Sequence, residues 1–133
     1  MKRIVLDTHV LIWWVDGDKR LSRNQRRVLS RLDAGPPALV PDIALWEVAT
    51  LHELNRIKLS LPLREWLDRA TALPLVECVP ITPAVATDVA ALPSWFHRDP
   101  ADRIIVATTR VHGARLLTND QRIIDAGIVE TVS

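Results

Sequence analysis

The chain has 133 residues, of which 48% are hydrophobic and 25% charged; these values fit one globular domain with a single core and exclude wholesale disorder. Its formal net charge of +1 neither indicates nor excludes a nucleic-acid-binding protein, because local patches of charge matter more than the sum. Cys78 is the single cysteine, which excludes an intramolecular disulfide, and the N-terminal apolar run at residues 4–6 is too short for a signal peptide or a membrane span, so we expect a cytoplasmic protein without a membrane partner.

Short apolar runs alternate with amphipathic segments along the whole chain. A brief continuous apolar run predicts a buried strand, and apolar residues three and four positions apart predict one face of a helix. In chain order we expect a strand at residues 3–6, helices at 10–15 and 22–33, a strand at 38–40, helices at 43–56 and 61–72, a strand at 75–81, helices at 83–92 and 100–112, a strand at 115–117, a short helix from residue 120 and a final strand at 128–132. This alternation indicates an α/β fold in which helices cover both faces of a mostly parallel sheet.

The starts of several predicted helices carry capping residues. Side chains of this kind accept hydrogen bonds from the free amide groups of the first turn. The expected N-caps are Ser22, Asp42, Asp99 and Asp120. Proline suits the first turn of a helix, so we expect Pro62 and Pro100 to lie there.

Acidic residues stand at four places where chemistry is expected: Asp7, Glu47, the pair Asp99 and Asp102, and Asp120. Each aspartate also has a structural interpretation as a capping residue, and Asp102 follows Asp99 at the spacing of a reciprocal cap. Functional residues of parallel sheets gather beyond the carboxyl ends of the strands. Because Asp7 and Asp120 each come just after a predicted strand, we expect both at the same edge of the sheet.

Glu47 is the acid that a capping role does not explain. It lies in the middle of a predicted helix, and the residues one turn away, Ile43 and Leu51, are apolar. A buried carboxylate without a partner costs several kcal/mol. Since no arginine or lysine lies one turn before or after it, its partner is either a distant arginine or a metal ion.

Taken together, the acids favour a metal site. Carboxylates gathered at one edge repel one another and need a divalent cation. Oxygen ligands without cysteine select Mg²⁺ or Mn²⁺ over zinc. Such an ion activates water and stabilises the charge on a phosphoryl group, which is the chemistry of phosphodiester hydrolysis.

Four segments resemble motifs of the PIN-domain family. Residues 4–9 (IVLDTH) look like its first strand and first acid, and residues 42–49 (DIALWEVA) are similar to the helix motif that carries the second acid. Residues 97–103 (HRDPADR) closely resemble the signature of VapC-like toxins, and residues 116–120 (LLTND) look like the final acidic motif. The order is that of the family, and the matches span nearly the whole chain.

The resemblance implies a three-layer α/β/α PIN-like domain over residues 1–133. It also implies an endoribonuclease dependent on Mg²⁺ or Mn²⁺, acting as the toxin of a toxin–antitoxin pair, with RNA as substrate, an antitoxin protein as partner and a homodimer as assembly. The catalytic acids and metal ligands that it implies are Asp7, Glu47, Asp102, Asp120 and Asp99. The helix motif Asp-x-x-Ile-x-Ala points to Asp102, whereas Asp99 belongs to the extended signature and is a ligand, a cap or both.

Polar neighbours of the acids are candidates for supporting roles. Thr8 and Thr118 shape turns or hydrogen-bond a ligand carboxylate, and Asn119 is grouped with them as a second-shell or substrate-binding residue. Arg98 and Arg103 bind RNA phosphate or balance charge.

His9 and His97 contact substrate, transfer protons or are surface and capping residues. Trp13 and Trp14 follow the first acid and are expected to anchor a protein partner.

Other functions are consistent with the same acids. A metal-dependent DNase or flap-type nuclease is one, although the chain lacks the long insertions expected for threading a flap. A non-catalytic nucleic-acid-binding module is another, and the intact acidic set argues against it. A receiver domain fits poorly, because it needs an acidic pair after the first strand and a lysine after the last, and both are missing.

Overall fold

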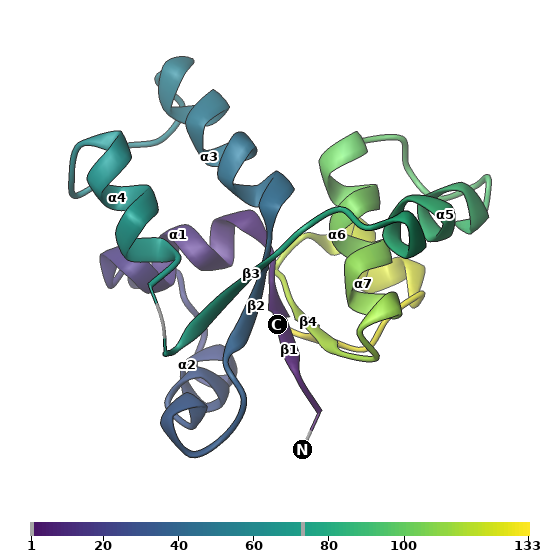
Figure 1. The fold of residues 1–133 in the computed structure, drawn as a ribbon, viewed down its shortest axis with the longest axis horizontal. Coiled ribbons are helices and arrows are strands. Elements are labelled where there is room, and N and C mark those ends of the chain that lie inside the picture. Colours follow the sequence, from purple (N-terminus) through teal and green to yellow (C-terminus); the bar gives the residue numbers. More distant parts are fainter. Residues whose placement is uncertain (1, 73) are drawn as a thin grey trace.

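The computed structural model describes residues 2–72 and 74–133, and within them the chain forms one five-stranded parallel sheet (Figure 1). The strand order is β3-β2-β1-β4-β5, and all four neighbouring pairs are parallel. The strands are β1 (Ile4–Leu6), β2 (Ala38–Pro41), β3 (Val76–Val79), β4 (Arg115–Leu117) and β5 (Thr131–Val132). The predicted α/β fold with a central parallel sheet is confirmed.

Helices cover both faces of this sheet. Four α-helices from the first part of the chain lie on one side, and three from the second part lie on the other (Figure 1). The first group is α1 (Thr8–Asp16), α2 (Arg23–Leu29), α3 (Asp42–Glu53) and α4 (Leu63–Ala70), with a 3₁₀ turn, η1 (Leu32–Ala34); the second is α5 (Pro83–Ala91), α6 (Pro100–Val111) and α7 (Gln121–Ala126). The three layers therefore match the expected arrangement.

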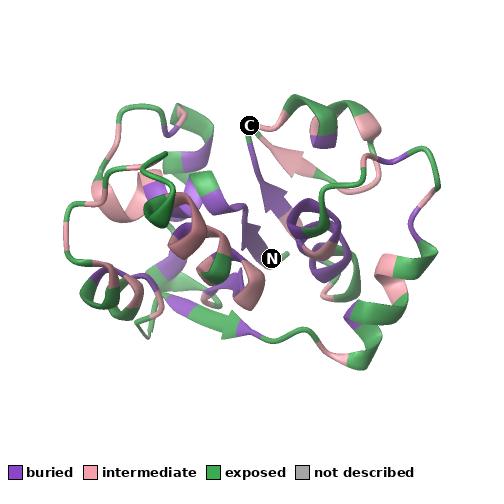
Figure 2. Cartoon of the chain, turned by 90° about the horizontal axis from the view of Figure 1, so that it is seen from above, coloured by how far each residue is buried: buried purple, intermediate pink, exposed green. Residues whose placement is uncertain are grey.

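Two apolar cores fill the spaces between the layers. Strand β1 shows why, since Ile4 and Leu6 belong to one core and Val5 to the other, as the alternation of side chains along a strand requires. Figure 2 shows the buried residues concentrated on the central strands and on the helix beside them. That helix is α6, most of which is buried.

Helix starts agree with the predicted caps with two exceptions. The Ser22 hydroxyl accepts a hydrogen bond from the amide of Gln25, and the Gln25 side chain accepts one from the amide of Ser22, which makes a capping box. The prediction for Asp42 was wrong: β2 continues through Pro41, which is the N-cap, so Asp42 is already the first residue of α3. Pro62 is likewise the N-cap of α4 and not a residue of its first turn.

Element ends differ from prediction where the backbone turns early. Helix α3 ends at Glu53 and not near residue 56, and Asn55 has a left-handed backbone with φ of 55°. The last strand covers only residues 131–132 because Ile128 and Val129 pack into the core beside α6 and do not pair in the sheet.

The topology sets the position of the functional edge. Strands β1 and β4 are neighbours in register, with Leu6 opposite Leu117. The residues that follow the two strands, Asp7 and Thr118, are therefore also side by side. No helix in the described part of the chain is long and apolar enough to cross a membrane.

Candidate active site

An open cleft of about 360 Å³ lies at the carboxyl edge of β1 and β4. Its walls come from α1, α3, α6 and the segment after β4. The lining residues are Asp7, His9, Trp13, Glu47, Asp99, Asp102, Asn119, Asp120 and Arg122. The structure thus brings together all five acids that the sequence singled out.

Asp7 is the buried acid at the centre of this edge. One carboxylate oxygen accepts a hydrogen bond from the amide of Thr8 at 2.8 Å, as the N-cap of α1, and the other accepts from the Thr118 hydroxyl at 2.6 Å. Burial raises the pKa of Asp7, and these two hydrogen bonds lower it only in part. These hydrogen bonds orient the buried carboxylate, and among the described residues no arginine or lysine forms an ion pair with it.

Glu47 receives a hydrogen bond from the hydroxyl of Thr8. Burial raises the pKa of Glu47, and the nearby carboxylates of Asp7 and Asp99 raise it further. Among the described residues no arginine or lysine forms an ion pair with Glu47, so the distant-arginine interpretation finds no support. Thr8 therefore joins two acids, because its backbone amide donates to Asp7 and its hydroxyl donates to Glu47.

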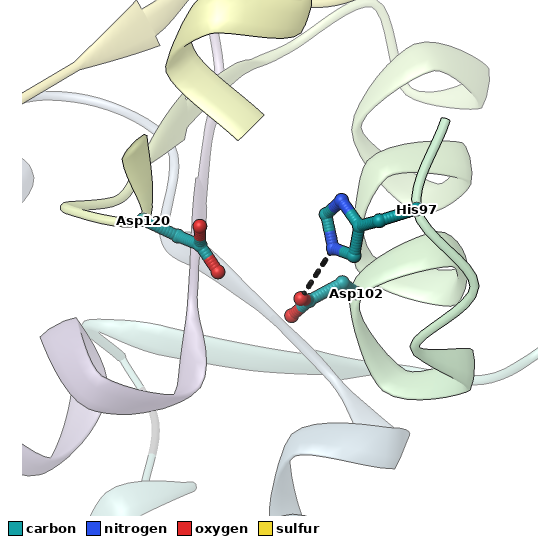
Figure 3. A group of neighbouring side chains, drawn as sticks. All are labelled: His97, Asp102 and Asp120. Carbon is teal, nitrogen blue, oxygen red and sulfur yellow. Dashed lines mark hydrogen bonds and ion pairs between the residues drawn. The ribbon is translucent and has the colours of Figure 1, made fainter. Parts of the chain in front are cut away.

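Asp102 and His97 form a hydrogen-bonded pair on the opposite wall (Figure 3). The Nε2 atom of His97 lies 2.7 Å from Oδ2 of Asp102. Burial, with added repulsion from the neighbouring carboxylates, raises the pKa of Asp102 to about 6. One ligand atom each from His97, Asp102 and Asp120 lies within 4.8 Å of the others, and Figure 3 shows the three side chains facing one another.

Asp120 differs from the other acids because it has a cationic partner. Burial alone would raise its pKa, but hydrogen bonds from the side chain and the amide of Arg122 outweigh that effect, and the pKa of Asp120 is lowered. The Nη2 atom of Arg122 lies 3.2 Å from Asp120 and 3.5 Å from Asp102. One guanidinium group thus bridges two of the acids.

Asp99 is the N-cap of α6, as its position before Pro100 predicted. Its carboxylate accepts a hydrogen bond from the amide of Asp102 at 3.0 Å. The residue is exposed and also lines the cleft. Its capping role is therefore observed, and a role as metal ligand stays a prediction.

Thr118 and Asn119 shape the segment after β4. The Thr118 hydroxyl donates to Asp7 and accepts from the amide of Asp120 at 3.0 Å. The hydroxyls of Thr8 and Thr118 therefore hydrogen-bond two of the acids, which was one of their two predicted roles. The Asn119 side chain lines the cleft and accepts a hydrogen bond from Gln25.

Among the described residues Arg103 forms no ion pair with an acid, so its predicted role in balancing charge finds no support, and its predicted role in binding RNA phosphate stays a prediction. It is buried, and its guanidinium donates hydrogen bonds to the backbone carbonyl groups of Phe96 at 3.0 Å and His97 at 3.2 Å. It therefore fastens the segment that carries His97 onto α6. Arg98 is exposed and is not among the residues that line the cleft.

Sequence reasoning left out Arg122 and Gln25 and did not rank His97 among the site residues. Arg122 lies two positions after an acid that caps a helix, which is a usable signal. Trp13 and Trp14 are both half-buried, Trp13 at the cleft and Trp14 at a separate apolar pocket. They are not the freely exposed anchors that the sequence suggested.

The residues of the cleft fit a divalent cation. The acids offer carboxylate oxygens, the ligands that hard cations prefer. Burial disfavours the charged forms of Asp7, Glu47 and Asp102. A cation bound between these carboxylates would stabilise their negative charges. The fold and the site together define an α/β protein able to hold a metal ion at the edge of its sheet.

Comparison with known proteins gives the family. Residues 4–129 match the PIN domain. Ribonuclease VapC22 of Mycobacterium tuberculosis is 41% identical over 123 residues, which are 92% of this chain and 91% of the relative. The chain therefore belongs to the PIN domain family.

Solved structures share the fold at low identity. VapBC2 from Rickettsia felis, bound to a DNA fragment from its promoter, superposes with a TM-score of 0.71 at 14% identity, over 97% of this chain and 96% of that one. A toxin–antitoxin complex from Klebsiella pneumoniae gives 0.65 at 23% identity, over 98% and 96%.

Proposed function

We propose that this protein is a metal-dependent endoribonuclease that acts as the toxin of a toxin–antitoxin pair. The observation that carries the proposal is the cleft in which five carboxylates converge, three of them with pKa values raised by burial. The relative that is 41% identical bears the name ribonuclease, which supports RNA as the substrate.

Asp7, Glu47, Asp102 and Asp120 are the proposed metal ligands, with Asp99 as a further candidate. All offer oxygen atoms, which favours Mg²⁺ or Mn²⁺. When bound, such a cation lowers the pKa of water and stabilises negative charge on a phosphoryl group. The protein's own contribution is to orient the acids, through the hydroxyls of the threonines, the imidazole of His97 and the guanidinium of Arg122.

Cleavage of RNA by the purified protein, freed of any bound inhibitor and stripped of metal, tests the proposal. We expect no cleavage in excess chelator, cleavage after addition of Mg²⁺ or Mn²⁺, and none by Asp102→Asn with either metal. Asp125→Asn is the matched control, because Asp125 is an exposed aspartate of α7 outside the cleft. Robust cleavage in excess chelator would overturn the metal mechanism.

A DNA strand of the same sequence distinguishes the alternative nuclease. The same acids are able to act on DNA, so cleavage of DNA in preference to RNA would replace the ribonuclease by a metal-dependent DNase. Binding of either strand without cleavage under any metal would identify a non-catalytic nucleic-acid-binding module. The complete set of acids in one cleft favours the enzyme over that module.

The partners belong to the same proposal. The resemblance to VapC-like toxins supports a homodimer, an inhibitory antitoxin protein and a cytoplasmic location. The exposed indoles of Trp46 (60%) and Trp95 (66%) supply apolar surface for contacts between proteins. We expect a dimer in sedimentation and a copurifying small protein that blocks cleavage. Monomers at micromolar concentration without such a partner would contradict both partner proposals.

A further inference from the structure

Gln25 is a buried amide whose orientation is fixed by its partners. It lies on α2, has no exposed surface and is not among the residues that line the cleft. Its Oε1 accepts from the amide of Ser22 at 3.1 Å, and its Nε2 donates to the carbonyl of Val132 at 3.0 Å. A backbone amide only donates and a carbonyl only accepts, so the two ends of the Gln25 carboxamide cannot be exchanged.

The orientation of Asn119 follows from that of Gln25. The Nε2 atom of Gln25 also lies 2.9 Å from the Asn119 side chain, and a donor at this distance requires an acceptor, which is Oδ1. The other end of the Asn119 carboxamide is therefore its NH₂ group. Within the described chain this group has no hydrogen-bond partner, and Asn119 is an exposed residue on the wall of the cleft.

The cleft needs hydrogen-bond donors that the acids do not provide. A phosphodiester is an anion, and five carboxylates line the place where it would bind. Arg122 is already paired with Asp120 and Asp102. Asparagine is a residue that commonly donates to phosphate oxygens, and it does so without adding a charge.

We propose that the Asn119 amide nitrogen binds a phosphate oxygen of the RNA substrate, and that Gln25 is the positioning residue that holds this donor in the cleft. The inference rests on the proposed ribonuclease function and adds a substrate contact to it. It also gives the capping box of α2 a role, because one glutamine joins the start of that helix, the end of β5 and the segment that follows β4.

RNA binding without cleavage tests the donor. In a cleavage-deficient Asp102→Asn background, the Kd for a short fluorescein-labelled single-stranded RNA is measured by anisotropy. We expect Asn119→Ala to raise Kd about tenfold, the usual loss for a hydrogen bond to a charged group. Asn119→Asp keeps the acceptor for Gln25, replaces the donor by negative charge, and raises Kd further. Asn24→Asp, the same change at an exposed position of α2, is the control and leaves Kd within about twofold.

A double-mutant cycle tests the positioning role. If Gln25 acts through Asn119, Gln25→Leu raises Kd, but the pair Gln25→Leu and Asn119→Ala binds no more weakly than Asn119→Ala alone. Additive losses would show that Gln25 supports the fold in general and would overturn its role.

The amide itself gives a readout that needs no change at Gln25. In ¹⁵N-labelled protein of the same Asp102→Asn background, the NH₂ resonances of Asn119 are assigned as those that disappear in the Asn119→Asp variant. We expect these resonances to shift on addition of RNA. Unshifted resonances in saturated protein, or an unchanged Kd in Asn119→Ala, would overturn the inference and leave the ribonuclease proposal standing. Failure of the unsubstituted protein to bind RNA would overturn both.

Discussion

Asp99 and Asp102 lie three residues apart at the start of α6, but their environments differ. Asp99 is exposed and caps the helix, and its carboxylate is committed to the amide of Asp102. Asp102 is buried and faces His97, Arg122 and the other acids. This contrast distinguishes the observed capping role of Asp99 from the metal-binding role that we propose for Asp102.

Substitution by asparagine tests this separation. Asparagine caps a helix about as well as aspartate, so Asp99→Asn is expected to retain more cleavage activity than Asp102→Asn, which loses it. The melting temperature of metal-free Asp102→Asn is expected to be unchanged at low pH and higher than that of the wild type at neutral pH, because the buried charge that the substitution removes is disfavoured. Cleavage rates beside thermal melts check both statements. If Asp99→Asn cleaves RNA more slowly than Asp102→Asn, Asp99 is the principal third acid.

Glu47 allows the test to be repeated on a different helix. We expect Glu47→Gln to abolish cleavage and to leave the metal-free melting temperature unchanged or higher, since burial raises the pKa of Glu47 and the amide oxygen still accepts from Thr8. Added Mg²⁺ should then raise the melting temperature of the wild type more than that of the variant, because binding stabilises the folded state. A variant that unfolds without metal would instead identify Glu47 as a structural residue.

Among the elements, the segment between α5 and α6 is held in place by the side chain of Arg103. Arg103 donates to two carbonyl groups of that segment, and its guanidinium lies over the Phe96 ring at 5.9 Å. Lysine presents a single compact charge and no planar fork. We therefore expect Arg103→Lys to lower the free energy of unfolding by on the order of 2 kcal/mol, the value of lost hydrogen bonds to a charged group.

Urea unfolding measures this effect, with Arg98→Lys as the matched control. Arg98 is exposed in the same segment and should tolerate the change. Because the segment carries His97, which hydrogen-bonds Asp102, Arg103→Lys is also expected to slow cleavage. Equal stability of the two variants would show that Arg103 does not hold the segment.

The elements themselves were predictable because their signals are local. Apolar runs of three residues marked β1 and β2, the pair Leu116 and Leu117 marked β4, and caps such as Ser22 and Asp99 marked helix starts. The errors lie where tertiary packing decides. Asp42 has the residue type of a cap, but β2 runs directly into α3. Ile128 and Val129 have the composition of a strand, but they pack in the core.

On the scale of the whole molecule, the acids of the site and their threonine partners were predictable, and the contacts that reach the site from distant elements were not. Asp7 and Asp120 follow strands, and the parallel topology alone brings them to one edge. The contact between Gln25 and Asn119 joins residues 94 positions apart, and neither residue type nor spacing reveals it. The sequence also places Arg103 beside the acids but does not reveal that its side chain is buried and donates to the backbone carbonyl groups of Phe96 and His97.

The gathered carboxylates make the stability of the metal-free molecule depend on pH. The pKa of Asp102 is raised from 3.8 to about 6, and those of Asp7 and Glu47 are raised as well. Between about pH 4 and pH 6 the folded protein therefore holds protons that the unfolded chain has released, and linkage requires these groups to lower the free energy of unfolding as pH rises through that window. The loss of stability that Asp102 causes becomes complete only after pH has risen past about 6, the pKa of Asp102 in the folded protein.

Chemical denaturation in chelator, at several pH values, measures this dependence. Other carboxylates titrate in the opposite sense, Asp18 among them with a pKa lowered to about 2 by its hydrogen bonds with Arg20, so the difference between the wild type and Asp102→Asn is the quantity to follow. We expect Asp102→Asn to gain stability over the wild type as pH rises from about 4 to about 6. Added Mg²⁺ is expected to stabilise the wild type more at about pH 7.5 than at about pH 5, because the cation binds the charged carboxylates and competes with their protons. A difference between wild type and variant that does not change with pH would show that Asp102 is not the group whose charge the fold disfavours.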